Sequence, residues 1–279
     1  MMLEAFQTFL VGQGKADNTV KSYCQAVGAY LKWYEETFGQ QAGGLYRANV
    51  LDYVSYLRTV KELSNKSVNA KLAALSSLNE FLISSGAQTD AVVGKSDYLK
   101  VQVPYANPCT VSKDDVEAFR QQILVRRGAR DYAIVTILAY AGLRVSECLA
   151  LRPEDVELSA REITVHHGKG DKLRVVFIGD KVINAVREYK KVRPDGSPYL
   201  FVSRKGGKLS RGQVNRIFND YSDTITPHTL RHFFCTQALE IAGYGVHELA
   251  NQAGHSNIHT TLIYTNPTRE KMKDKANKL

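Results

Sequence analysis

The sequence changes its pattern at VPYANP, Val103 to Pro108, a stretch with two prolines and no hydrophobic periodicity. Before this stretch the apolar residues follow helical spacing, and after it helical stretches alternate with two stretches typical of strands. A chain of 279 residues is long enough for two domains with separate cores. We therefore expect a helical domain at 1–102, a linker at 103–110 and a second domain at 111–279.

The first part predicts a small bundle of about four helices. Its longest helix would begin at Asn18, a residue type that suits an N-cap, and would end at Gly39. The apolar positions of that helix are Val20, Tyr23, Val27, Tyr30, Leu31, Tyr34 and Phe38. The other helices are expected at 2–11, at 48–60 and from Asn65 to a stop at Gly86.

The second part mixes helices with a hairpin. Ser112 with Asp115 three residues later forms a capping-box pattern that opens a helix. EITVHH (162–167) and LRVVFI (173–178) are typical of two strands joined by the turn GKGD. Further helices are predicted at 130–141, 144–151, 180–192, 210–220, 227–242 and 246–252. The expected fold class is mainly α (α+β), with a small antiparallel sheet in a mostly helical second domain.

Basic residues are concentrated in the second part. The formal charge is +9 and the isoelectric point is about 9.3. Residues 1–103 contain 10 basic and 9 acidic residues, whereas residues 104–279 contain 27 and 19. This excess is compatible with a polyanionic partner such as nucleic acid, although a solubilising surface would give the same count.

Several classes of protein find no support in the sequence. No run of about 18 apolar residues suggests a membrane span, and Glu4 stands where a signal peptide would be basic, so we expect a cytoplasmic protein. The cysteines form no C-x-x-C pair and no acidic cluster suits Mg²⁺, so neither a metal nor a cofactor is expected. The four cysteines are Cys24, Cys109, Cys148 and Cys235.

TPHTLRHF, Thr226 to Phe233, could form a phosphate site at the start of a helix. Thr226 can cap the helix and Pro227 suits its first position. His228 and Arg231 would then lie three residues apart, beside the positive end of the helix dipole. Taken alone, the stretch could equally contain a capping histidine and a surface arginine.

Two further stretches contain basic residues in unusual surroundings. In AYAGLRVSECLAL, Arg144 follows a glycine that breaks an apolar helix, and Glu147 is placed to orient it. A structural ion pair explains that spacing as well as function does. In GKGDK, Lys169 lies between two glycines at the expected hairpin tip, where an ordinary solvated lysine is the alternative. The spacing does not match a P-loop.

GHSNIHTTLIYTN, Gly254 to Asn266, sets Tyr264 nine positions beyond His255. A buried structural tyrosine is the usual explanation for one such residue. Taken with the other stretches, however, the chain offers two arginines, two histidines, a lysine and a tyrosine. Arginines can neutralise a phosphate in its transition state, tyrosine can act as a nucleophile, and lysine can protonate a leaving alkoxide. This set of residues indicates phosphodiester chemistry.

These stretches resemble the tyrosine recombinases, the phage-integrase and Xer-type site-specific DNA recombinases. The motifs AGLRVSE, GKGDKLRVV, HTLRHFFCTQAL and GHSNIHTTLIYTN occur in the order and at the spacing of that family. NTVKSY and NAKLAALSSLNEFL resemble its helical core-binding domain, so the resemblance covers nearly the whole chain. It implies a core-binding domain in the first part and a catalytic domain with a C-terminal tail helix in the second.

The resemblance implies a role for each of these residues. Tyr264 would attack the scissile phosphate, form a 3′-phosphotyrosyl bond and free a 5′-hydroxyl. Lys169 would be the general acid for that leaving oxygen, and Glu147 would orient the first arginine. The phosphate would be held by Arg144, Arg231, His228 and His255. Rejoining would need neither ATP nor a metal ion, because the covalent bond conserves the energy of the phosphodiester.

The chain departs from the family pattern at one place and is ambiguous at another. Ala253 stands where the family often has leucine before Gly-His, a change in packing that leaves His255 in place. Lys172 lies close enough to Lys169 to compete for the acid role. Because nothing long precedes the core-binding helices, we expect no separate arm-binding domain. This favours an Xer-like recombinase or a transposon- or plasmid-borne resolvase, with a small integrase as an alternative.

The resemblance also implies partners. The two domains would clamp duplex DNA carrying an inverted-repeat core site, and a homotetramer would pair two such sites. The protein would lie in the cytoplasm, associated with the nucleoid. The tail TREKMKDKANKL (268–279) would dock on a neighbouring protomer through Met272, Ala276 and Leu279, unless it is a frayed end. Candidates for groove contacts with base edges are the core-binding helices and the helix at 210–220, the latter equally explained as a solvated face. Its candidate side chains are Arg211, Gln213, Asn215 and Arg216.

Two other functions fit parts of the same pattern. A type IB topoisomerase-like enzyme would use the same cleavage chemistry to relax DNA without exchanging partners. A non-catalytic DNA-binding protein could retain the fold after losing activity, but the complete set of six residues argues against it. Dimer resolution, cointegrate resolution, integration and inversion share one chemistry, so the sequence does not distinguish them.

Overall fold

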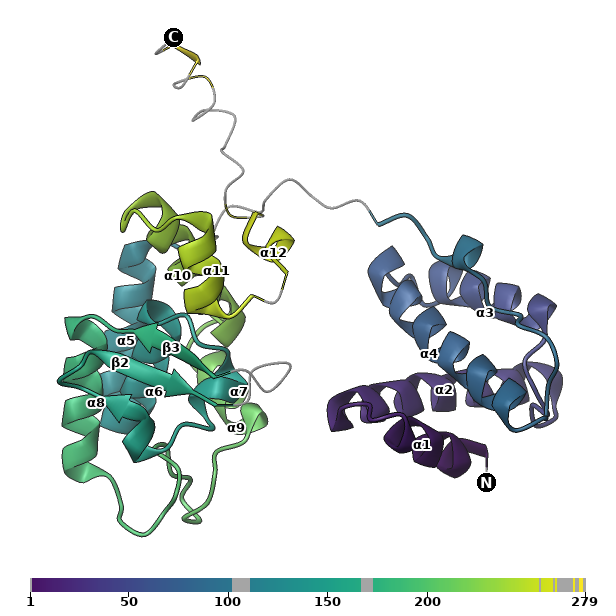
Figure 1. The fold of residues 1–279 in the computed structure, drawn as a ribbon, viewed down its shortest axis with the longest axis horizontal. Coiled ribbons are helices and arrows are strands. Elements are labelled where there is room, and N and C mark those ends of the chain that lie inside the picture. The colour runs from purple at the N-terminus through teal and green to yellow at the C-terminus, as the bar shows by residue number, and fades with distance from the viewer. Residues whose placement is uncertain are drawn as a thin grey trace. The chain divides into compact units, whose positions relative to one another are not determined.

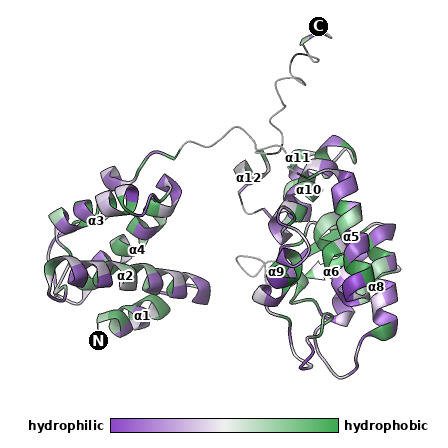
Figure 2. Ribbon diagram, turned by 180° about the vertical axis from the view of Figure 1, so that it is seen from behind, coloured by the Kyte–Doolittle hydropathy of each residue, from purple (hydrophilic) through white to green (hydrophobic). Residues whose placement is uncertain are grey.

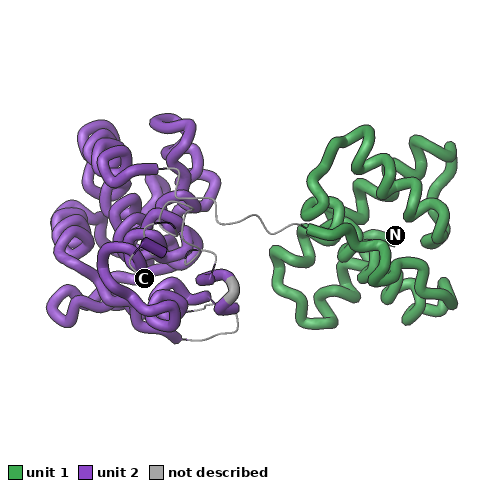
Figure 3. The backbone as a smooth tube through the Cα atoms, turned by 90° about the horizontal axis from the view of Figure 1, so that it is seen from above, with its two compact units in different colours: residues 1–103 green, residues 104–279 purple. Residues whose placement is uncertain are grey.

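The structure is a computed structural model that describes residues 2–101, 111–166, 173–255 and 257–262, together with positions 264, 273, 276 and 277. The chain divides into two compact units, residues 1–103 and residues 104–279 (Figure 3). The expected linker at 103–110, the GKGD turn and nearly all of the expected tail helix lie outside the described residues. The two units are described separately below.

Unit 1 is a helical bundle, as the sequence predicted. Its main helices are α1 (Met2–Gly12), α2 (Asp17–Phe38), α3 (Arg47–Thr59) and α4 (Asn65–Ser84), followed by a short 3₁₀ turn η1 (Lys95–Asp97) (Figure 1). Aromatic side chains dominate the core: the Tyr30 and Tyr53 rings meet edge to face at 5.1 Å, and Trp33 lies 4.9 Å from Tyr53. The helical periodicity of the first hundred residues therefore reflects one shared core.

The ends of these helices follow local chemistry. The prediction that Asn18 caps α2 is wrong, because the helix begins at Asp17 and the extended Ala16 occupies the cap position. The carboxylate of Asp17 in the first turn suits the positive end of the helix. Gly39 ends α2 with φ of 68°, as predicted. Ser64 caps α4 by accepting a hydrogen bond from the Ser67 amide at 3.3 Å.

Unit 2 is mostly helical around a small sheet. Its longer helices are α5 (Lys113–Arg127), α6 (Ala129–Tyr140), α8 (Asp180–Val192), α9 (Arg211–Asn219), α10 (Pro227–Glu240) and α11 (Val246–Ala253). α6 packs against α5, α8 and α10 and is buried along most of its length. Hydrophilic and hydrophobic residues alternate along α8 (Figure 2), whose apolar side faces the core. Ser112 and Asp115 form the predicted capping box at α5.

The sheet has three antiparallel strands in the order β1-β2-β3. The predicted hairpin strands are confirmed as β2 (Glu162–Val165) and β3 (Arg174–Phe177), with Ile163 opposite Val176. β1 (Val156–Glu157) was not predicted, because two residues are too few to show an alternating pattern. The Gln252 amide bonds the Phe177 backbone at 3.1 and 2.8 Å, which holds α11 against the edge of β3.

Two short helices differ from the sequence-based expectation. The predicted helix at 144–151 is only one turn, α7 (Val145–Cys148), and α12 (His259–Leu262) was not predicted. Beyond α7 the Ala150 amide bonds the carbonyl three residues back, in a turn tighter than an α-helix, and the Leu200 amide then donates to the Leu151 carbonyl at 2.7 Å. In the described part of the chain, no helix has the length and apolar character needed to cross a membrane.

Candidate active site

Arg144 caps α7 and is tied to two distant parts of unit 2. Its Nη1 donates to Glu147 Oε1 at 2.9 Å, and its backbone amide donates to Glu147 Oε2 at 2.8 Å. Its Nη2 donates to the carbonyl of Gly254 at 2.6 Å. The side chain remains 37% exposed, so the guanidinium is oriented on one side and open to solvent on the other.

Glu147 is buried between two arginines. Arg174, the first residue of β3, donates from Nη1 and Nη2 to the two carboxylate oxygens at 3.0 and 2.8 Å. Burial alone would raise the pKa of Glu147, but the hydrogen bonds and charge of Arg174 and the bonds from Arg144 hold the pKa below its ordinary value. Glu147 is therefore an anion that fixes two guanidinium groups.

Arg231 of α10 is buried without a carboxylate partner among the described residues. Its Nη1 donates to the Gly142 carbonyl and its Nη2 to the Ala253 carbonyl, both at 2.6 Å. Burial, and then the positive charge of Arg144, lower the pKa of this guanidinium. A buried cation bonded only to neutral carbonyls favours the approach of an anion.

The guanidinium groups of Arg144, Arg174 and Arg231 all lie against carbonyls at the C-terminus of α11. Arg174 lies within reach of the Gln252 and Ala253 carbonyls, at 3.4 and 3.5 Å, and the carbonyls of Ala253 and Gly254 accept from the other two arginines. The last carbonyls of a helix have no partner within it and carry the negative end of its dipole. They hold the arginines in place but leave the cluster with three cations to one carboxylate.

His255 is the residue after Gly254 and lies next to this cluster. Its Nδ1 lies 2.8 Å from the hydroxyl of Thr261, a fully buried residue of α12. Burial, and then the charges of Arg231, Arg144 and Arg174, lower the pKa of His255 to about 4. The imidazole is therefore neutral at physiological pH and can donate or accept a hydrogen bond without adding charge.

Tyr264 lies against two histidine rings. Its ring is nearly parallel to that of His255, with centroids 6.3 Å apart, and 5.1 Å from that of His232. It packs on the small core cluster formed by α10 and α11, which includes Phe234 and Leu249. The half-buried phenol is thus held beside the histidines by apolar packing.

His228 and His232 lie one turn apart on α10. Their Nε2 atoms are 2.8 Å apart, and their rings meet edge to face at 4.3 Å. Thr226 caps this helix by accepting from the Thr229 amide at 3.1 Å, and Pro227 occupies its first position, as predicted. The cap places His228 on an exposed first turn, whereas Arg231 points into the core.

Most of the predicted site residues are close neighbours in unit 2, but the contacts do not test their roles. Lys169 and its competitor Lys172 lie outside the described residues. Sequence reasoning missed Arg174 and His232, although each belongs to a motif that was singled out. An arginine at the start of an apolar strand in LRVV, and a histidine four residues after His228, were the available signals.

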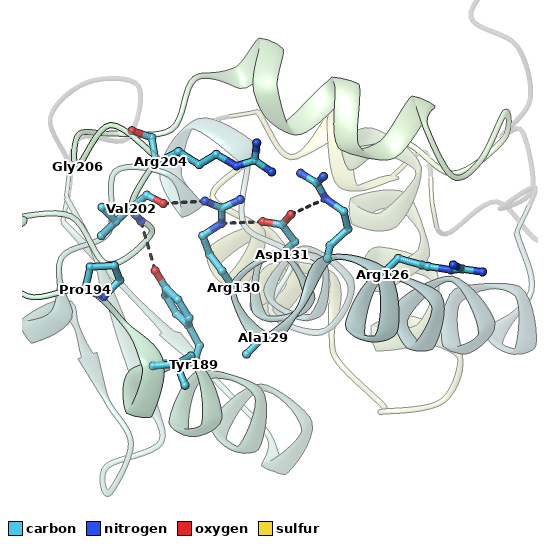
Figure 4. A pocket seen from close by; sticks show the side chains of 12 residues that line it. Arg126, Ala129, Arg130, Asp131, Tyr189, Pro194, Val202, Arg204 and Gly206 are labelled. Atoms are coloured by element: carbon cyan, nitrogen blue, oxygen red, sulfur yellow. Dashed lines mark hydrogen bonds and ion pairs between the residues drawn. The ribbon is translucent and has the colours of Figure 1, made fainter.

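A second basic region lies beside α9. Two adjoining cavities are lined by the ends of α5, α6 and α8, by the 203–208 loop and by α9. In Figure 4, Arg130 lies between Asp131 and the Val202 carbonyl, and Arg204 extends across the same cleft. We call it the basic cleft; its basic lining residues are Arg126, Arg127, Arg130, Arg204, Lys205, Lys208 and Arg216.

The four predicted base-reading residues are all exposed on α9, whose Val214, Ile217 and Phe218 face the core. Gln213 and Arg216 line the basic cleft, whereas Arg211 and Asn215 do not. In the described part of the chain, no group of three or more histidine, cysteine or acidic residues is arranged to hold a metal ion. Among the described residues of unit 2, the arginine cluster and the basic cleft both suit an anion.

Comparison with known proteins identifies the family. Residues 110–271 match the model of the phage integrase family, and residues 2–84 match that of the phage integrase N-terminal SAM-like domain. The chain belongs to the phage integrase family and is a tyrosine site-specific recombinase, which confirms the resemblance drawn from the motifs.

Two relatives span almost the whole chain. A TnP I resolvase from Bacillus thuringiensis is 47% identical over 275 residues, covering 97% of this chain and 96% of the relative. Tyrosine recombinase XerA from Thermococcus kodakarensis is 34% identical over 280 residues, covering 98% and 93%. Both relatives match unit 1 as well as unit 2, so the similarity extends over the whole fold.

Solved structures show the same fold at lower identity. The Tn1549 transposon integrase in complex with a circular intermediate DNA has a TM-score of 0.72 at 20% identity, covering 99% of this chain and 98% of that one. A lambda integrase dimer bound to a core site also has a TM-score of 0.72, at 15% identity, covering 96% and 95%. The predicted mainly α fold with a small antiparallel sheet is confirmed.

Proposed function

We propose that this recombinase cleaves and rejoins duplex DNA through a covalent bond between Tyr264 and the 3′ side of the scissile phosphate. The observation that carries the proposal is the convergence of three guanidinium groups around Gly254, where Glu147 bonds two of them and Arg231 bonds backbone carbonyls. A pentacoordinate phosphate carries more negative charge than the diester, so this excess of positive charge stabilises the transition state most.

In the proposed step one phosphorus–oxygen bond forms and another breaks. One proton leaves Tyr264 and another reaches the leaving oxygen. The Tyr264 oxygen attacks phosphorus, and its proton passes to an imidazole of the site, His228 or His255. The bond from phosphorus to the 5′ oxygen breaks, and Lys169 protonates that oxygen to give a 5′-hydroxyl. Rejoining reverses these steps with the 5′-hydroxyl of a partner strand, so the phosphotyrosyl bond supplies the energy and no ATP is needed.

Two of the three arginines bind the phosphate in this proposal. Arg144 and Arg231 would hold the nonbridging oxygens, since each guanidinium is oriented by backbone carbonyls and Arg144 is partly open to solvent. Glu147 would keep Arg144 in the orientation that the phosphate needs. Because planar guanidinium groups stabilise the charge, the mechanism gives no step to a metal ion.

The basic cleft and α9 would contact the DNA on the flank of the cleavage site. Arg127 and Arg130 share the single carboxylate of Asp131, and Arg204 and Lys205 extend from the loop beside them. Such a surface suits phosphates, whereas Gln213 and Arg216 on its border have the side chains that read base edges. The transposon and lambda integrases were solved with DNA, which supports DNA as the partner here.

The assembly would be a homotetramer on two inverted-repeat sites, with the tail at 268–279 docked on a neighbouring protomer. The tail lies almost wholly outside the described residues, and the proposal rests on its stripe of Met272, Ala276 and Leu279. Deleting residues 268–279 should abolish pairing of two sites in a gel-shift assay while leaving binding to one half-site. Intact synapsis after the deletion would rule out docking.

The central test is a trapped covalent intermediate. The probe is a duplex selected from a random library for binding to this protein, with a nick beside the cleavage position so that the freed strand diffuses away. We expect a protein–DNA adduct on a denaturing gel for the wild type and none for Tyr264→Phe. Absence of an adduct on a duplex that the protein binds would favour the non-catalytic alternative.

A second assay separates recombination from relaxation. A supercoiled plasmid carrying two copies of the selected duplex should yield resolved or inverted products with the recombinase. Relaxation without any exchange of partners would favour the type IB topoisomerase-like alternative instead.

A further inference from the structure

His232 has no role in the mechanism proposed above, yet it contacts two of its participants. Its Nε2 lies 2.8 Å from the Nε2 of His228, and its ring centroid lies 5.1 Å from that of Tyr264. It follows Arg231 directly on α10 and is half-buried. A side chain in contact with both a proposed phosphate ligand and the proposed nucleophile can set the position of both.

The contact between the two histidines restricts their protons. A hydrogen bond between two ring nitrogens needs one donor and one acceptor, and an imidazolium has no acceptor. The pair can therefore hold one imidazolium at most. Burial, and then the charges of His228 and Arg231, lower the pKa of His232, which favours its neutral form.

The same bond fixes the orientation of the His228 ring, because its Nε2 lies 2.8 Å from that of His232. A neutral His228 that accepts at Nε2 carries its proton on Nδ1. When His228 gains a second proton, it donates from Nε2 and His232 becomes the acceptor.

We propose that His232 is a positioning residue of this recombinase: through Nε2 it holds the ring of His228, the proposed phosphate ligand, in a fixed orientation, and its own ring packs against Tyr264. This inference rests on the proposed function, and it assigns His232 no direct contact with DNA. The two contacts use different parts of the side chain, so two substitutions can separate them.

Three variants of His232 remove the Nε2 contact, the ring contact or both. His232→Phe keeps a ring beside Tyr264 but removes the nitrogen that bonds His228. His232→Gln places an amide, which can donate or accept, near the position of Nε2 but removes the ring. His232→Leu removes both. Melting temperature and affinity for the selected duplex are measured for each, because a positioning role changes neither by much.

The readout is the single-turnover rate of adduct formation on the nicked, selected duplex. We expect His232→Phe and His232→Leu to slow this rate by about tenfold to a hundredfold at unchanged DNA affinity, as small displacements of reacting groups do. His232→Gln should recover part of the loss. In a His228→Ala background the His232→Phe substitution should have no further effect, since the group through which it acts is gone.

Three outcomes would overturn the inference. These are a wild-type rate for His232→Phe, the same fold-loss with and without His228, or a loss that follows the melting temperature in all three variants. The first two leave a Tyr264-dependent adduct in the wild type, so the proposed function stands. If the wild type itself forms no such adduct, both the proposed function and the role of His232 fall.

Discussion

A Cβ atom at Gly254 would lie 2.6 Å from the guanidinium carbon of Arg174, at a backbone position with φ of +69°. Gly243 has a similar φ of +73° but nothing within 4 Å of the same point. Both Gly→Ala substitutions impose the backbone cost of a left-handed residue, about 1–2 kcal/mol. Only the substitution at Gly254 also displaces a member of the arginine cluster.

We therefore expect Gly254→Ala to slow adduct formation by about tenfold or more, whereas Gly243→Ala lowers stability alone. Urea unfolding gives the stability change, and single-turnover cleavage of the selected duplex gives the rate. Equal rates for the two variants would show that the position of Arg174 does not matter for cleavage.

Lys169 and Lys172 can be separated by changing the leaving group. Replacing the 5′-bridging oxygen of the substrate by sulfur creates a thiolate leaving group, which needs no proton because a thiol has a pKa of about 8.5. The general-acid variant should cleave ordinary DNA about a hundredfold more slowly and regain nearly the wild-type rate with sulfur. We expect this pattern for Lys169→Ala. If Lys172→Ala shows it instead, the acid role moves to Lys172.

The ionisation of the His255 ring leads to a prediction about how stability depends on pH. Its pKa is lowered from the ordinary 6.5 to about 4, so folding favours the neutral ring. The corresponding stability is complete above about pH 6.5 and is lost as the pH falls through 6.5 toward 4. Carbon-13 NMR of labelled histidines, assigned with His255→Gln, should show no titration of this ring above about pH 5. A midpoint near 6.5 in the folded protein would contradict the neutral state.

At the scale of elements, Asn79 fastens α4 to the segment that follows it. This buried amide accepts from the Val92 and Val93 backbone at 2.6 and 3.3 Å and donates to the Asp90 carbonyl at 3.1 Å. Removing it leaves buried backbone groups without partners. We expect Asn79→Ala to lower the free energy of unfolding of unit 1 by about 2 kcal/mol or more.

The single tryptophan makes the unfolding of unit 1 measurable, because Trp33 is buried in that unit and its fluorescence reports on it. The matched control is Asn65→Ala, which removes an exposed amide bonded to the Lys100 carbonyl and should cost well under half as much. Equal shifts of the urea midpoint would mean that burial of Asn79 contributes nothing.

The elements differ in how well they could be predicted. α5 and α10 were placed by Ser112 with Asp115 and by Thr226 with Pro227, because capping depends on neighbours within four residues. α7 was predicted too long, because Ala150 and Leu151 form a tighter turn in place of a further helical turn, and no residue pattern marks that change. β1 and α12 are too short for any periodicity to indicate them.

At the scale of the whole molecule, the basic cleft should contribute to the salt dependence of DNA binding. Removing one side chain that binds a phosphate reduces the slope of log affinity against log salt concentration by about 0.9. We expect the double variant Arg204→Ala with Lys205→Ala to reduce the slope by nearly 2 on a random-sequence duplex.

The matched control removes the same charge from the exposed surface of α8, outside the lining of the cleft. It combines Arg187→Ala with Lys191→Ala, and these side chains bond Asn184 and Glu188. An equal drop in both double variants would assign the effect to net charge and remove the cleft from the DNA interface.

Local patterns along the chain were enough to predict the helical first part, the strands of the hairpin and the family. Periodicity, caps and glycine stops act over a few residues, and the motif order is a property of the linear chain. Arg144 and Glu147 could be paired from their spacing alone, because the contact between them spans less than one turn.

The groups that surround the proposed phosphate position could not be predicted before the three-dimensional packing was known. Arg174 and Arg231 meet at the end of α11 through contacts with residues 252 and 253, and His232 meets Tyr264 across 32 positions of sequence. Hydrogen bonds and charge from the two arginines lower the pKa of Glu147 against the effect of burial, whereas burial and the guanidinium charges together lower that of His255. Such convergence depends on how helices and sheet pack, and packing is a property of the whole unit and not of any local pattern.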